Sequence, residues 1–74
     1  MNFREAAKTI IDFGKYNGKT IEEISLTDKG LKYLDWAYGN CVVHNPVVQR
    51  AIEIYMEDNI IKKELAEVLD GDYD

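Results

Sequence analysis

The chain has 74 residues, of which 46% are hydrophobic and 31% are charged. This composition is typical of a globular protein, and a chain of this length forms one small domain that buries about 60% of its unfolded surface. A deep internal active site is therefore not expected. We also expect a cytoplasmic protein, because the single Cys41 excludes an internal disulfide and no apolar run reaches the ~20 residues of a membrane span.

The net charge of −5 is distributed unevenly along the sequence. Six basic and five acidic residues lie within residues 1–33, whereas three basic and nine acidic residues lie within residues 34–74. The front of the chain is thus nearly neutral and the rear is acidic. Proteins that bind nucleic acid usually carry a basic excess, since neutralisation of phosphates supplies much of their affinity. The overall charge therefore opposes nucleic-acid binding.

Near the N-terminus, apolar residues recur at helical spacing. Asn2 can cap a helix whose third residue is Glu5, so the sequence predicts a short helix over residues 3–9. Residues 9–13 favour a strand instead. The dipeptide Asn17-Gly18 then predicts the tight turn of a β-hairpin that pairs Tyr16 with Lys19. Strand alternation would place one set of side chains on one face (Gly14, Tyr16, Lys19, Ile21) and a second set on the other (Phe13, Lys15, Thr20).

Helix signals follow the predicted hairpin. Thr20 and Glu23 have the spacing of a capping box, which predicts a short helix with Ile21 and Ile24 turned inward. Thr27 or Asp28 can cap the next helix. Its apolar stripe consists of Leu31, Leu34, Ala37 and Tyr38, and Gly39 stands where a left-handed C-terminal residue is favoured.

Asn45-Pro46 predicts the start of a last helix that could run to about Leu69 and span about 36 Å. Its apolar stripe changes phase after residues 57–59. Either the helix breaks at Asp58-Asn59 and folds back over the hairpin as a separate short helix, or its distal part projects and contacts a protein partner or a second copy through Ile61, Leu65, Val68 and Leu69. We expect an α+β fold, with a β-hairpin packed against three or four helices and a long C-terminal helix. Residues 1–70 form the single domain and residues 71–74 an acidic tail.

Lysines and aromatic residues alternate in the predicted hairpin and in the helix that follows. The candidate binding residues are Lys15, Tyr16, Lys19, Tyr33 and Trp36. One interpretation is a nucleic-acid contact in which Tyr16 stacks on a base. The alternative is that the lysines keep the ribbon soluble and that Trp36 fills the core.

Two other groups of residues have alternative readings. Glu57, Asp58, Glu64 and Glu67 could imitate the charge of a nucleic-acid backbone, or they could form an ordinary solvated helix face. Cys41 and His44 have the spacing of half a zinc site, but the chain contains no other cysteine or histidine. We therefore expect no metal, no cofactor and no catalytic residue.

A family resemblance rests on two segments, FGKYNGKTIEEI at residues 13–24 and DKGLKYLDW at residues 28–36. Together they resemble the small domain at the C-terminus of exodeoxyribonuclease X-like proteins. The resemblance implies an accessory module of DNA-processing enzymes, which is also found in small free-standing proteins of phages and prophages. It covers about residues 10–37 and includes no catalytic exonuclease domain, so no nuclease activity is transferred.

Two hypotheses for function result. The first is a non-catalytic binding protein, an adaptor or inhibitor, that engages nucleic-acid-processing machinery through protein contacts, including by acidic imitation of nucleic acid. The second is an accessory module that binds nucleic acid directly through its lysine and tyrosine residues. The acidic rear half favours the first hypothesis.

Overall fold

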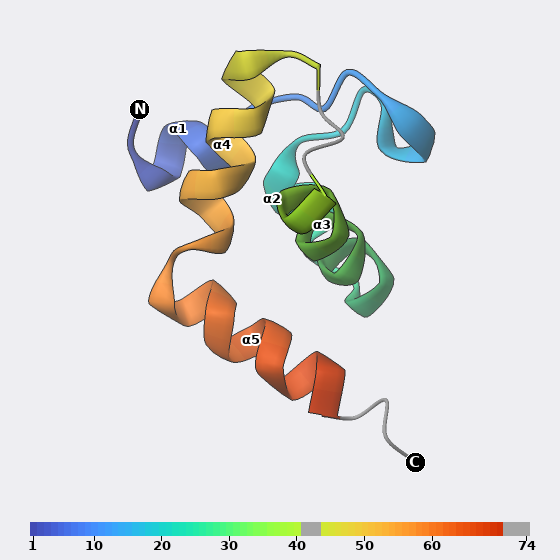
Figure 1. Ribbon diagram of the computed structural model, residues 1–74, viewed down its shortest axis with the longest axis vertical. Helices are drawn as coiled ribbons and strands as arrows, with labels where there is room; N and C mark the ends of the chain where they lie inside the picture. Colours follow the sequence, from blue (N-terminus) through green and yellow to red (C-terminus); the bar gives the residue numbers. More distant parts are fainter. Residues whose placement is uncertain (41–43, 71–74) are drawn as a thin grey trace.

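The computed structural model describes residues 1–40 and 44–70, and within them every regular element is helical (Figure 1). Residues 10 and 20 form an isolated antiparallel bridge, and no sheet occurs in the described residues. The expected α+β fold with a β-hairpin is therefore wrong. The elements are α1 (Phe3–Ala7), the 3₁₀ turn η1 (Gly14–Tyr16), α2 (Ile21–Ile24), α3 (Asp28–Asn40), α4 (Pro46–Met56) and α5 (Asn59–Asp70).

The Asn17-Gly18 turn forms where the sequence places it, but it is a different type of turn. Asn17 has φ −53° and ψ 129° and Gly18 has φ 93°, which defines a type II turn closed by a 3.0 Å bond from the Lys19 amide to the Tyr16 carbonyl. Type II turns do not match the twist of paired strands. Gly14, with φ 67°, also redirects the chain into η1. Residues 11–19 therefore form a loop closed at its base instead of two strands.

The two short helices begin at the predicted capping boxes. The Glu5 amide donates to Asn2 Oδ1 over 2.8 Å, and the Glu23 amide donates to Thr20 Oγ1 over 3.2 Å. Ile21, the first residue of α2, is fully buried. These helices are predictable because a capping box is a contact between residues three apart.

Helix α3 begins as expected, since the Gly30 amide donates to Thr27 Oγ1 over 3.0 Å. Its end differs from the prediction. Gly39 lies inside the helix, which continues to Asn40, and does not adopt a left-handed conformation. Gly30 is needed for another reason: a Cβ atom there would meet the carbonyl oxygen of Ile24, so a glycine lets α3 pack closely against α2.

The prediction of one long C-terminal helix is also wrong, because α4 ends at Met56 and a separate helix, α5, begins at Asn59. Asp58 Oδ2 accepts the amides of Ile60 and Ile61 at 3.0 and 3.4 Å, so this carboxylate starts a new helix. Helix α5 then folds back against α3 and α4, not over the 11–19 loop (Figure 1). The fold-back alternative holds, with a different packing partner.

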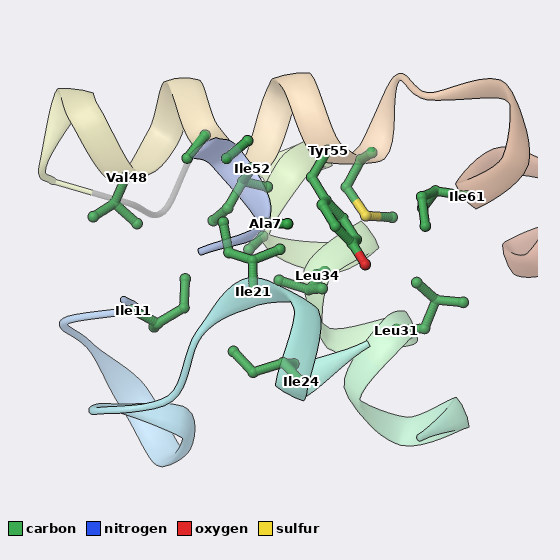
Figure 2. Close-up of a cluster of buried hydrophobic side chains, with 14 residues drawn as sticks. Ala7, Ile11, Ile21, Ile24, Leu31, Leu34, Val48, Ile52, Tyr55 and Ile61 are labelled. Atoms are coloured by element: carbon green, nitrogen blue, oxygen red, sulfur yellow. The ribbon is translucent and has the colours of Figure 1, made fainter. Parts of the chain in front are cut away.

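One buried cluster contains residues of all five α-helices together with Ile11, the first residue of the 11–19 loop (Figure 2). Burial of each large aliphatic side chain contributes about 1.5–3 kcal/mol. The largest fully buried side chains are Ile11, Ile21, Ile24, Leu34 and Ile52. Tyr55 completes the cluster, because its ring stacks on Phe3 with centroids 4.9 Å apart and its hydroxyl lies 2.7 Å from Ser25 Oγ. Among the described helices, none has the length and apolar character needed to cross a membrane.

Candidate functional site

The ring of Tyr33 is the centre of an aromatic cluster at the surface. Three rings surround it: Phe13 at a centroid distance of 6.2 Å, Tyr16 at 4.9 Å in an edge-on orientation, and Trp36 at 5.7 Å. Together with Lys15 these residues are called the Lys–aromatic face below. Each aromatic pair of this kind contributes about 0.5–1.5 kcal/mol beyond the area that it buries.

The loop reaches Tyr33 because residue 14 is a glycine. A Cβ atom on Gly14 would collide with the Tyr33 hydroxyl, and the φ of 67° there disfavours any other residue. Phe13 directly precedes the 3₁₀ turn in an extended conformation, and Tyr16 is the last residue of the turn, so the backbone reverses between them at Gly14. Phe13 and Tyr16 therefore both contact Tyr33, whereas strand alternation would have placed them on opposite faces.

Helix α3 supplies Tyr33 and Trp36, which lie three residues apart and so share a side of the helix. Trp36 remains 49% exposed, and therefore does not fill the core. Tyr33 is partly buried, with one side covered by the loop. The cluster thus presents a half-exposed indole beside partly covered phenol rings.

Positive charge lies directly over these rings. The Nζ atom of Lys15 is 5.4 Å from the Tyr16 centroid and 5.8 Å from the Tyr33 centroid, within range of a cation–π interaction. Lys19 is exposed on the same loop, although its side chain makes no such contact in the part of the chain that the structure describes. Lys29 is exposed one helical turn before Tyr33.

Burial raises the pKa of Tyr33 above its usual value of 10.0, and electrostatic repulsion from the nearby Tyr16 hydroxyl raises it further by a smaller amount. The phenol therefore remains neutral and a hydrogen-bond donor throughout the physiological pH range. A neutral phenol does not repel an anionic ligand.

The four predicted acidic residues do not form one uniform surface. Glu57 accepts a 3.4 Å hydrogen bond from the Tyr38 hydroxyl, and this carboxylate is the main cause of the raised pKa of Tyr38. Asp58 is occupied as the cap of α5. Glu64 and Glu67 are exposed and line a groove together with Asp28.

The predicted partner-binding residues of α5 differ in their exposure. Ile61 is 6% exposed and belongs to the core. Leu65 and Val68 are partly buried and pack against this core. Leu69 is 39% exposed and the neighbouring Ile60 is 69% exposed. Binding of a partner by this helix stays a prediction, and the apolar surface open to it is smaller than the sequence suggests.

Cys41 lies outside the described residues, and His44 is exposed at the surface. Within residues 1–40 and 44–70, no group of three or more His, Cys, Asp or Glu side chains is arranged to hold a metal ion.

Sequence reasoning missed two residues of this region, Phe13 and Lys29. The signal for Lys29 was its spacing of four residues from Tyr33, which places both on one side of a helix. The position of Phe13 depends on the backbone turn at Gly14, which residue alternation cannot reveal.

The fold and the site together define a small helical domain with an exposed Lys–aromatic face. Residues 11–41 match the family described as exodeoxyribonuclease X-like C-terminal, which confirms the resemblance found in the sequence. Every residue of the Lys–aromatic face lies within this matched segment. Comparisons with curated proteins and with solved structures gave no match.

Proposed function

We propose that this chain is a non-catalytic binding module of nucleic-acid-processing machinery and that its Lys–aromatic face contacts single-stranded nucleic acid. The observation that supports this proposal most is the position of Lys15 over Tyr16 and Tyr33, beside the half-exposed Trp36. Exposed aromatic rings stack on unpaired bases of any sequence, and adjacent lysines neutralise phosphates. The similarity to an exodeoxyribonuclease-associated domain points to the same class of ligand.

The acidic net charge is compatible with this proposal because the charges lie apart. The 11–19 loop and α5 are at opposite ends of the view in Figure 1, and the molecule extends over 35 × 24 × 20 Å. At 0.1 M ionic strength, interactions between exposed charges are screened beyond about 10 Å. Screening therefore weakens the repulsion between a strand bound at the loop end of the Lys–aromatic face and those carboxylates of α5 that lie farther away than this.

The affinity should be modest and sensitive to salt. Lys15, Lys19 and Lys29 are the exposed lysines of the loop and the adjacent turn of α3. For single strands, the logarithm of the binding constant falls with that of the salt concentration by about 0.7 per neutralised phosphate. Two or three phosphate contacts thus predict a weak complex that forms best at low salt.

Fluorescence anisotropy with a labelled oligothymidylate of about 15 nucleotides tests this proposal, at about 50 and 200 mM salt. We expect salt-sensitive binding that weakens strongly in the variant Lys15→Glu/Lys19→Glu. The variant Lys62→Glu/Lys63→Glu is the matched control, because it changes the net charge equally at exposed positions of α5. Equal affinity of the two variants, or no binding at the lower salt concentration, would contradict the proposal.

A second candidate is an adaptor or inhibitor that acts through protein contacts, and the exposed Glu64 and Glu67 beside a groove favour it. Capture of partners from a host lysate, with a Glu64→Lys/Glu67→Lys variant as control, tests this candidate. With this candidate function we also propose that the protein is cytoplasmic, that it is of a phage type, and that its acidic residues imitate nucleic acid.

A further inference from the structure

A groove of about 380 Å³ lies between α5 and the turn that joins α2 to α3. Its apolar part combines the buried Leu31 and the partly buried Val68 with Leu26, which is 82% exposed. Leu26 is the most exposed of the large hydrophobic residues in the described part of the chain. A ligand that covers this exposed leucine removes apolar surface from water, and this burial stabilises the complex.

Three carboxylates, those of Asp28, Glu64 and Glu67, also line this groove. No salt bridge joins any of them to a lysine or arginine among residues 1–40 and 44–70. The groove therefore presents an apolar floor next to three carboxylates. A ligand complementary to it is cationic and carries an apolar group.

We propose that this groove binds a cationic amphipathic segment of a partner protein. An apolar side chain of the segment would cover Leu26 and Leu31, and lysine or arginine side chains beside it would face the carboxylates. Charge disfavours two other occupants: residues 71–74 contain two aspartates, and a second copy of the chain carries a net charge of −5.

This binding is independent of the proposed nucleic-acid contact. Leu31 and Tyr33 are two residues apart on α3, which separates their side chains by about 200° around the helix axis. The groove and the Lys–aromatic face therefore lie on different sides of the helix. The protein could hold a strand on one side and a basic partner segment on the other.

The test uses the whole chain and three labelled helical peptides of about 12 residues, long enough for three turns. One peptide has leucines four residues apart flanked by lysines, the second has glutamates in place of the lysines, and the third has serines in place of the leucines. We expect binding of the lysine–leucine peptide alone. In Leu26→Ala and in Glu64→Gln/Glu67→Gln its affinity should fall about tenfold, which corresponds to 1.4 kcal/mol.

Two variants provide matched controls. Ile60→Ala removes another exposed aliphatic side chain, and Glu22→Gln removes an exposed carboxylate from α2. Both should bind the peptide as the unchanged chain does, and Leu26→Ala should retain oligothymidylate binding. Equal binding of the first two peptides, or equal loss in Leu26→Ala and Ile60→Ala, would overturn the proposal. Self-association that Leu26→Ala abolishes in sedimentation would overturn it also, because the occupant would then be a second copy.

Discussion

The phenol ring of Tyr33 lies against the indole of Trp36, with 5.7 Å between the ring centroids, and its hydroxyl fills the space where a side chain on residue 14 would begin. The position of the aromatic cluster thus depends on a glycine in the loop. Because Gly14 and Tyr33 come from different parts of the chain, their contact also fixes the 11–19 loop against α3.

Replacing Gly14 with alanine should destabilise the protein. Alanine at a φ of 67° is strained by about 1–2 kcal/mol, and its Cβ atom must also displace the Tyr33 hydroxyl. We expect chemical denaturation to give a free energy of unfolding lower by about 2 kcal/mol or more.

Gly39→Ala is the matched control for this change. Gly39 lies within α3 and nothing occupies the space of an added Cβ atom there. Alanine is favoured over glycine in helices by about 1 kcal/mol, so this variant should be as stable as the unchanged chain or more so. The same loss of stability in both variants would contradict the packing of Tyr33 against Gly14.

Two adjacent isoleucines test whether α5 packs on the domain or projects from it. Ile61 is 6% exposed and Ile60 is 69% exposed. Ile61→Ala should reduce the free energy of unfolding by about 2–4 kcal/mol through the cavity that it leaves. Ile60→Ala should change it by less than about 0.5 kcal/mol, as is usual at the surface. Similar small effects in both variants would mean that α5 does not belong to the core.

Stability should decrease at alkaline pH because of Tyr55. Its burial raises the pKa of this phenol above 10.0, although the hydrogen bond with Ser25 lowers it in part. A folded-state pKa above that of the unfolded chain means that the unfolded chain loses its proton first. The contribution of Tyr55 to stability is therefore complete below pH 10 and decreases as the pH rises further.

Denaturation of the Tyr55→Phe variant across this range measures the effect. The variant should be less stable near neutral pH by about 1 kcal/mol, because the hydroxyl bonded to Ser25 is lost. Its stability should then decrease less steeply above pH 10. A residual decrease is expected, since the pKa values of Tyr33 and Tyr38 are raised too. An unchanged slope would assign the alkaline transition to other groups.

The sequence predicted the contacts that are local. The capping boxes at Asn2 and Thr20 and the helix start at Asn45-Pro46 all form, because each depends on residues within one turn of a helix. The break before α5 was visible as a change of phase. The capping ability of Asp58 would have decided between the two alternatives.

The sequence did not reveal the path of the 11–19 loop. Asn-Gly is compatible with hairpin turns and with the type II turn that forms here. The close approach of Gly14 to Tyr33 joins residues far apart in the chain, so residue spacing does not reveal it. Of the predicted binding residues, Lys15, Tyr16, Tyr33 and Trp36 do come together. They do so through a 3₁₀ turn and not across the face of a ribbon.

Trp36 offers the most direct test of the central claim, because it is the single tryptophan of the chain and belongs to the Lys–aromatic face. Its fluorescence should be quenched as oligothymidylate is added at low salt, since a stacked base contacts the indole. The Lys62→Glu/Lys63→Glu control should show the same quenching, and Lys15→Glu/Lys19→Glu should show much less. Emission that stays constant while anisotropy reports binding would place the strand elsewhere on the protein and contradict this account.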